Sequence, residues 1–360
     1  GGELRPVVDR RYPLEQMAAA RHVAVQSIVL LKNNGNLLPL DAAKLRSIAV
    51  IGPNAAVART GGGGSSAVRP KYAVTPLDGV RERAGARIQV GQAQGVWMEG
   101  EEPANQTPEA RAAMLAEAVD LARKSDVALL FVGDGPTIES EGFDRKSLAL
   151  PAGQDELIQA VARANRNTVV VLNVGSPVLM SNWLGQVPAL VNAWFPGQEG
   201  GHAIADVLFG DFNPSGKLPV TFLREEKDSP AFGHYPGENS EVDYAEGVYV
   251  GYRHFDKQGI QPLFPFGFGL SYTTFAYSDL QISPAKAGAD QPVEVSLKLA
   301  NTGQRLGAEV VQIYLHDVKS SLDRPVRELK AFERVELKPG EARTVTFKLD
   351  KSAFSYFDPA

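Results

Sequence analysis

The chain has 360 residues, of which 44% are hydrophobic and 22% charged, which is enough for two or three globular domains with cores of their own. Its formal net charge is -5 and it has no block of lysine or arginine, so nucleic acid and an anionic membrane surface are not expected as partners. No apolar run approaches the roughly 20 residues needed to span a bilayer, and the first residues lack the pattern of a signal peptide.

Cysteine is absent, which excludes a disulfide framework, a thiolate nucleophile and a cysteine-ligated metal. The five histidines lie far apart without a local metal-binding spacing, so we interpret each as an ordinary structural or surface residue. We therefore expect neither a metal nor a cofactor.

The first half of the chain alternates helix and strand patterns. Residues 14–32 are rich in alanine with helical spacing and predict one amphipathic helix that ends before the turn at 33–35. Residues 47–54 read as a buried strand. The patterns that follow predict helices at 108–124, 152–165 and 199–209, and strands at 126–133, 168–174, 189–195 and 217–222. Such alternation predicts a doubly wound α/β sandwich.

A glycine run at residues 61–66 follows the first strand. It has neither the lysine of a P-loop nor the spacing of a dinucleotide fingerprint, so nucleotide binding is disfavoured. Ser65 and Ser66 offer hydroxyls, and the run is compatible with a loop that closes over a polar ligand.

The second half of the chain changes character. Residues 224–265 are rich in proline, glycine and tyrosine without periodicity, as in a connector with fixed turns. Beyond them, strand patterns at 293–299, 310–315 and 343–349 are separated by turn signals and predict a small β-sandwich with a supporting role. We expect a helical lead-in at 1–45, an α/β domain at 46–223, a connector at 224–265 and a β-sandwich at 266–360.

Residues 139–145 carry three carboxylates, a glycine and an arginine. They follow the apolar strand at 126–133, so the loop opens at the carboxyl end of a buried parallel strand, where α/β sheets bind ligands. On composition alone such a charge run is usually a solvated loop. Gly142 permits a tight turn and Phe143 offers an apolar face, and we expect a carboxyl beside that ring to have a raised pKa, as a general acid requires.

Several segments in this order resemble the C-terminal half of a glycoside hydrolase family 3 enzyme of the β-glucosidase kind, with an α/β sandwich and a fibronectin type III-like domain. The matching segments are residues 27–33 (SIVLLKN), 37–40 (LLPL), 51–54 (IGPN), 141–145 (EGFDR), 194–201 (WFPGQEGG), 213–219 (NPSGKLP) and 265–272 (PFGFGLSY).

The resemblance implies retaining hydrolysis of β-glycosides, in which a carboxylate nucleophile and an acid/base carboxyl lie about 5 Å apart. By motif position the acid/base is Glu141, with Glu139 as the reserve candidate. Asp144 and Arg145 are expected to pair with each other or with the backbone and so to orient the loop. Phe143 would wall the leaving-group site, with loop packing as its alternative role, and Ser65 falls where the family has a serine near the sugar.

The chain departs from the family pattern in two ways. It lacks the Ser-Asp-Trp-like nucleophile stretch and its (β/α)8 barrel, and it stops at Ala360 before the strands that usually complete the sandwich. We therefore expect a piece of a larger protein whose missing N-terminal barrel, in the same polypeptide or another chain, completes the site. Loss of the barrel would also uncover an apolar face.

Three functions stay open: a β-glucosidase part acting on β-glucosides or oligosaccharides, a β-xylosidase of the same family, or a non-catalytic carbohydrate-binding or interaction module. A homodimer also stays open. The resemblance favours a periplasmic or secreted protein.

Overall fold

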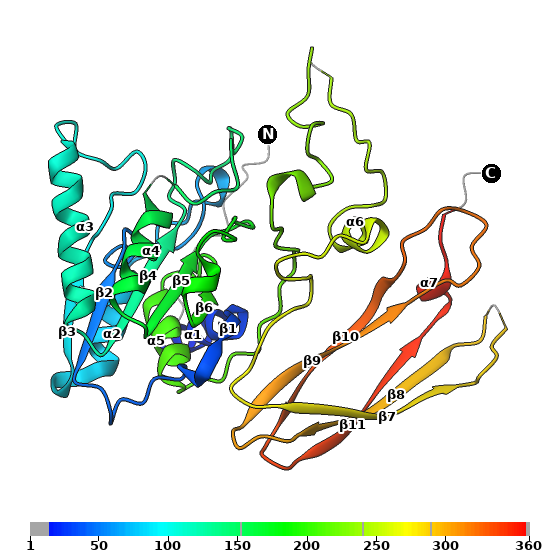
Figure 1. Ribbon diagram of the computed structural model, residues 1–360. Helices are drawn as coiled ribbons and strands as arrows, with labels where there is room; N and C mark the ends of the chain where they lie inside the picture. The colour runs from blue at the N-terminus through cyan, green and yellow to red at the C-terminus, as the bar shows by residue number, and fades with distance from the viewer. Residues whose placement is uncertain (1–13, 152, 240, 289, 358–360) are drawn as a thin grey trace, which may run out of the picture.

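A computed structural model describes residues 14–357 except 152, 240 and 289. Figure 1 shows a layered α/β domain on one side and a β-sandwich on the other, joined by a long connector that projects above both. The predicted fold class, a doubly wound α/β domain followed by a β-sandwich, is confirmed.

The α/β domain is built on a six-stranded sheet with the order β1-β6-β5-β4-β2-β3. Strands β2 to β6 are parallel, and β1 pairs antiparallel with β6. The central strands are continuous apolar runs that are buried throughout, as expected for a parallel sheet covered on both faces. The strands are β1 (Val29–Asn33), β2 (Ser47–Ile51), β3 (Gln89–Ala93), β4 (Val127–Gly133), β5 (Thr168–Asn173) and β6 (Ala189–Asn192).

Helices cover both faces of this sheet. Buried side chains of α1, α2 and α5 share one core cluster with the sheet, and those of α3 and α4 share the other. The chain passes from β2 outward to β3 and then returns to β4 on the other side of β2, so the winding direction reverses between β2 and β4. The helices are α1 (Leu14–Ser27), α2 (Pro76–Ala84), α3 (Pro108–Arg123), α4 (Gln154–Ala164) and α5 (Gly200–Phe209).

Two predicted elements are wrong. Residues 14–32 do not form one helix, because α1 ends at Ser27 and residues 29–33 form β1. Residues 28–31 are all apolar and all buried. A strand in a sheet that is covered on both faces can bury such a continuous apolar run. The expected lead-in at 1–45 therefore includes an edge strand of the sheet. The expected strand at 217–222 reduces to one bridge between Phe222 and Phe264.

The connector leads from the α/β domain to the sandwich and contains α6 (Tyr252–Gln258). Its last residues pack on the α/β domain, because Leu270 bridges to Leu30 and the Tyr272 hydroxyl donates to the Val207 carbonyl at 2.8 Å. The first strand of the sandwich begins at Phe275, so the expected boundary at residue 266 falls within the packed connector.

The β-sandwich consists of a three-stranded sheet, β11-β8-β7, and a two-stranded sheet, β10-β9, all antiparallel. Alternate residues of β8, β9, β10 and β11 point inward and form a separate apolar core, in keeping with the period of two. The strands are β7 (Phe275–Ser283), β8 (Val293–Asn301), β9 (Gly307–Leu315), β10 (Glu328–Leu337) and β11 (Ala342–Leu349), and a short helix α7 (Lys351–Phe354) follows.

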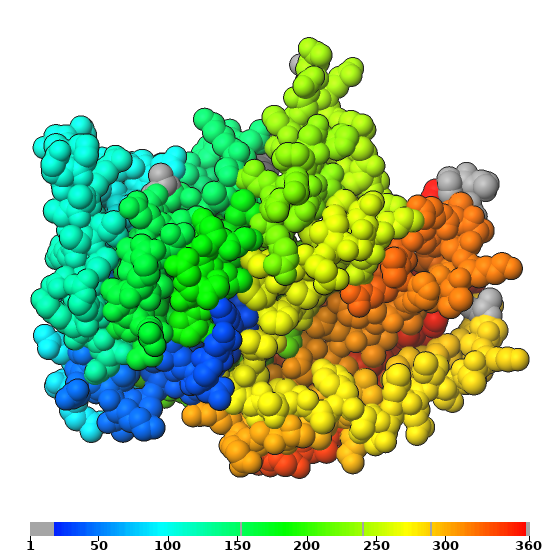
Figure 2. Space-filling model, in the orientation of Figure 1, coloured from blue at the N-terminus to red at the C-terminus, as the bar shows by residue number. Residues whose placement is uncertain are grey.

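In the part of the chain that the structure describes, five short 3-10 turns complete the fold, at Asn34–Asn36, Gly64–Ser66, Gly85–Arg87, Leu184–Gln186 and Glu226–Asp228. Among residues 14–357 with the gaps named above, the helices are all too short or too polar to cross a membrane. Figure 2 shows that the connector stands out from the surface beside the loops of the α/β domain.

Candidate active site

The acidic loop lies at the carboxyl edge of the parallel sheet. Asp134 follows β4 directly, and residues 135–151 extend beyond the sheet before α4 begins. The neighbouring loops come from β2, which leads to the glycine run, and from β5, which leads to Gly175 and Ser176. The winding reverses between β2 and β4, and their loops lead to helices on opposite faces, so this is the switch point where open α/β sheets bind ligands.

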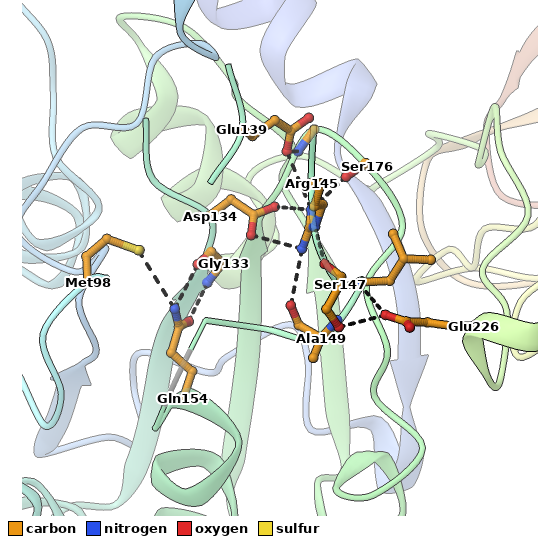
Figure 3. Close-up of polar contacts among 12 residues, drawn as sticks. Met98, Gly133, Asp134, Glu139, Arg145, Ser147, Ala149, Gln154, Ser176 and Glu226 are labelled. Atoms are coloured by element: carbon orange, nitrogen blue, oxygen red, sulfur yellow. Dashed lines mark hydrogen bonds and ion pairs between the residues drawn. The ribbon is translucent and has the colours of Figure 1, made fainter. Parts of the chain in front are cut away.

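Arg145 fastens the far end of the loop to the sheet (Figure 3). Its Nη1 lies 2.7 Å from Oδ2 of Asp134 and its Nη2 lies 3.1 Å from Oδ1, a bidentate ion pair. Nη1 also donates to the Ser176 hydroxyl at 2.7 Å, and Nε donates to the Ser147 carbonyl at 2.8 Å. The aspartate partner of Arg145 is therefore Asp134 and not Asp144. Planar guanidinium groups favour this two-point geometry.

Asp144 faces the connector instead. Its carboxylate accepts a hydrogen bond from the Tyr235 hydroxyl, so it links the loop to a segment 91 residues further along the chain. The connector also reaches the loop through Glu226, whose carboxylate accepts from the Ser147 hydroxyl at 2.6 Å. The loop is thus held by the sheet on one side and by the connector on the other.

Glu139 is turned toward the sheet. Its Oε2 accepts a hydrogen bond from the backbone N–H of Gly175 at 2.9 Å and lies 3.9 Å from Nη1 of Arg145. Its side chain is 26% exposed. The Glu139 carboxylate is therefore engaged in contacts that hold the loop in place.

Glu141 is exposed at the surface of the loop. Its Oε2 accepts a hydrogen bond from the backbone N–H of Ser65 at 2.8 Å. The hydroxyl and the backbone N–H of Ser65 both lower the pKa of Glu141 from its ordinary value. The expectation of a raised pKa beside an aromatic ring is therefore wrong for this chain, because Phe143 is 48% exposed and the Glu141 carboxylate stays in solvent.

The glycine run packs directly against this loop. The backbone N–H of Gly63 donates to the Glu139 carbonyl at 3.1 Å. Gly64 has φ +70°, and a Cβ at this position would lie 2.3 Å from Cβ of Glu141. The absence of a side chain at Gly64 therefore lets the backbone of the glycine run lie directly against the side chain of Glu141. Ser66 turns back to its own loop, where its hydroxyl donates to the Gly63 carbonyl.

Phe143 lines an open cavity of about 350 Å³ on the outer side of the loop. The cavity wall also includes the charged residues Glu99, Asp144 and Lys146. Glu141 does not line this cavity, so the assignment of Phe143 to a leaving-group site stays a prediction.

Asp134 is the buried acid that sequence reasoning missed. It is fully buried, and burial raises its pKa to about 7, with Glu139 acting in the same direction and Arg145 opposing it. Its place directly after the apolar strand at 127–133 was a usable signal, since polar residues at strand ends often form sites. Within the described residues, no group of three or more histidine, aspartate and glutamate side chains could hold a metal ion.

The α/β sandwich, the carboxylate loop at its switch point and the attached β-sandwich together define a module of two domains, with its candidate site on the α/β domain. Residues 28–272 match the glycosyl hydrolase family 3 C-terminal domain, and residues 309–360 match the fibronectin type III-like domain. The chain belongs to glycoside hydrolase family 3.

Individual relatives agree with this assignment. Thermostable beta-glucosidase B of Acetivibrio thermocellus is 43% identical over 339 residues, which are 94% of this chain and 44% of the relative. An exo-alpha-(1->6)-L-arabinopyranosidase of Bifidobacterium breve is 41% identical over 345 residues, with 94% and 44% covered. A periplasmic beta-glucosidase of Salmonella typhimurium is 38% identical over 351 residues, with 94% and 46% covered.

Solved structures share the whole fold. The crystal structure of the GH3 beta-glucosidase of Bifidobacterium adolescentis superposes with a TM-score of 0.88 at 40% identity and covers 98% of this chain and 50% of that chain. The chain thus spans about half the length of the relatives it matches.

Proposed function

We propose that this chain supplies the general acid/base half of a retaining β-glucosidase, with Glu141 as the acid/base. The observation that carries the proposal is the opposite placement of the two candidate carboxylates. Glu139 is turned inward onto Gly175 and Arg145, whereas Glu141 is exposed at the switch point and held by Ser65. An acid/base must reach the glycosidic oxygen of a substrate, which an exposed carboxylate can do.

In this mechanism Glu141 donates its proton to the leaving oxygen as the glycosyl bond breaks, and then removes a proton from the attacking water. The nucleophile is an aspartate of an N-terminal barrel that lies outside this chain. Its carboxylate, about 5 Å away in retaining enzymes, would raise the pKa of Glu141 through like-charge repulsion. The pKa of Glu141 therefore does not need to be raised in this chain without the barrel.

The bond from Ser65 orients the Glu141 carboxylate, and Arg145 fixes the loop that carries it. Loss of such positioning costs catalysis although neither group exchanges a proton with substrate. Phe143 forms an apolar wall toward the leaving group in this proposal.

Terminal β-D-glucosyl residues are the proposed substrate, because the A. thermocellus and B. adolescentis relatives are named β-glucosidases. The B. breve relative is named for an arabinopyranoside, so the same C-terminal half occurs with another sugar. A β-xylosidase remains the alternative within the family. The missing barrel is the proposed partner, and the name of the S. typhimurium relative supports a periplasmic location.

The test uses the full-length protein at pH 6 with substrates of good and poor leaving groups. Glu141→Ala should lower hydrolysis of poor-leaving-group glucosides by roughly 10²–10⁴-fold. Azide should partly restore turnover of p-nitrophenyl β-D-glucoside, and Glu139→Ala should have less than a tenfold effect on either substrate class. Reversed effects would assign the acid/base to Glu139, and two near-neutral variants would remove the function from this loop. A non-catalytic module would hydrolyse neither p-nitrophenyl β-D-glucoside nor the xyloside.

A further inference from the structure

Two carboxyl groups share one guanidinium at the base of the loop (Figure 3). Asp134 pairs with Arg145 at 2.7 Å and 3.1 Å, and Glu139 lies 3.9 Å from the same Nη1. In the part of the chain that the structure describes, Arg145 is the one basic side chain in ion-pair contact with either carboxyl group.

Besides Arg145, the groups that bond the two carboxyl groups are uncharged. Two charged groups lie further out. The Ser147 hydroxyl and Arg145 both help to lower the pKa of Glu226 in the connector, and a Cβ on Gly135 would lie 3.8 Å from Cζ of Arg59, which pairs with Glu101. From the end of β5, Gly175 contributes an N–H to Glu139 and Ser176 contributes a hydroxyl to Arg145. From α4, the buried Gln154 donates to the carbonyl of Gly133 and accepts from its N–H, at 2.8 Å and 2.7 Å. With both acids ionised, the cluster would therefore hold two negative charges against one positive charge.

A buried excess charge of this kind is costly, and one proton removes it. Asp134 is fully buried, and burial together with the neighbouring Glu139 raises its pKa to about 7. A negative charge beside a buried carboxyl group favours the protonated form of that group.

We propose that the buried Asp134 holds a proton because Glu139 lies against the same Arg145 guanidinium, and that this arrangement is a pH-sensitive clamp on the loop that carries Glu141. The clamp acts at both ends of the loop segment, through Glu139 before Glu141 and through Arg145 after it. Asp134, Glu139 and Arg145 are positioning residues, and their link to catalysis rests on the function proposed above.

The direction of the pH effect follows from the charges. The folded protein binds this proton more tightly than the unfolded chain, so its stabilising effect is full below pH 4 and is lost as pH rises through about 7. Above that pH the second negative charge appears, Glu139 and Asp134 repel one another, and the loop opens more often.

The experiment measures amide hydrogen exchange of the loop peptide 134–147 in the full-length protein between pH 5.5 and 8.5, corrected for the intrinsic pH dependence of exchange. The wild-type loop should lose up to about tenfold in protection per pH unit as pH rises to about 7, and its protection should level off above that pH. In Glu139→Gln, the amide oxygen still accepts from Gly175 while one charge is gone, so protection should hardly change with pH. Equal pH dependence in the variant and the wild type would overturn the clamp.

Asp144→Asn is the matched control, because Asp144 also bonds this loop to the connector, through the Tyr235 hydroxyl, but in the described residues forms no ion pair with Arg145. It should keep the wild-type pH dependence, and flattening by this variant as well would also overturn the proposal. The two experiments test the clamp and the proposed function independently. If Glu141→Ala leaves hydrolysis intact while Glu139→Gln flattens the exchange profile, the function is wrong and the clamp stands, and the reverse pattern removes the clamp alone.

Discussion

Gly64 is the position where a single methyl group should separate the two loops of the site. A Cβ there would lie 2.3 Å from Cβ of Glu141 and 3.0 Å from its backbone nitrogen. Carbon atoms in contact prefer about 3.5–4.0 Å, so Gly64→Ala requires a relative shift of about 1 Å or more. The left-handed backbone at φ +70° adds strain of about 1–2 kcal/mol for a residue with a side chain.

The expected result follows from this displacement. The shift moves Glu141 away from the Ser65 N–H, and a misplacement of about 1 Å can cost on the order of 10²-fold in rate. We therefore expect kcat/KM for p-nitrophenyl β-D-glucoside in the full-length protein to fall about 100-fold, with about 1–3 kcal/mol lost from the free energy of unfolding.

Two matched variants separate strain from collision. Gly85 has a similar φ of +64° with nothing within 4 Å of the added methyl, so Gly85→Ala should lose stability alone. Gly62 lies in the same run with ordinary contacts, 3.4 Å from the Ser66 hydroxyl, so Gly62→Ala should keep activity. Full activity in Gly64→Ala, or an equal loss in Gly85→Ala, would refute the reasoning.

Two further predictions follow from single contacts. Ser65→Ala removes the hydroxyl that lowers the pKa of Glu141, and since a general acid works while protonated, the alkaline limb of the kcat/KM profile should move to higher pH. An unchanged or lower alkaline limb would contradict that assignment. Phe131→Ala empties a fully buried site in β4 and should lower the free energy of unfolding in urea by about 3–5 kcal/mol. Leu280→Ala, at a position 64% exposed, should stay within about 0.5 kcal/mol, and similar losses in both would argue against the core assigned to β4.

Strands β2, β4, β5 and β6 and the place of the acidic loop were predictable because their signals are local. The apolar runs of β4 and β5 are long enough to identify buried parallel strands, and a loop after such a strand must open at the carboxyl edge. The helix α2 was missed although its start signal is local too. Thr75 caps it by accepting from the Asp78 N–H at 3.1 Å, and Pro76 occupies the first helical position.

Other features depend on partners distant in sequence. Residues 28–31 suit a helix or a strand, and the free edge of β6 decides for the strand. The local sequence does not predict that Arg145 pairs with Asp134 and not with the adjacent Asp144. That pairing depends on where β4 ends and on the Tyr235 hydroxyl, which donates to the carboxylate of Asp144. The inward position of Glu139 and the exposed position of Glu141 likewise depend on contacts from other loops.

The two glutamates differ in which neighbouring strand's loop supplies their hydrogen-bond donor. The order of strands in the sheet therefore determines where each carboxylate lies. Glu139 is held from the end of β5 by the N–H of Gly175, and Glu141 is held from the loop after β2 by the N–H of Ser65. Since β4 lies between β2 and β5 in the sheet, its loop meets a donor from each side. Only the β2 side coincides with the reversal of winding, which is where open α/β sheets bind ligands. Glu141, held from that side, is exposed, whereas Glu139, held from the β5 side, is 26% exposed and bonds to the framework of the site.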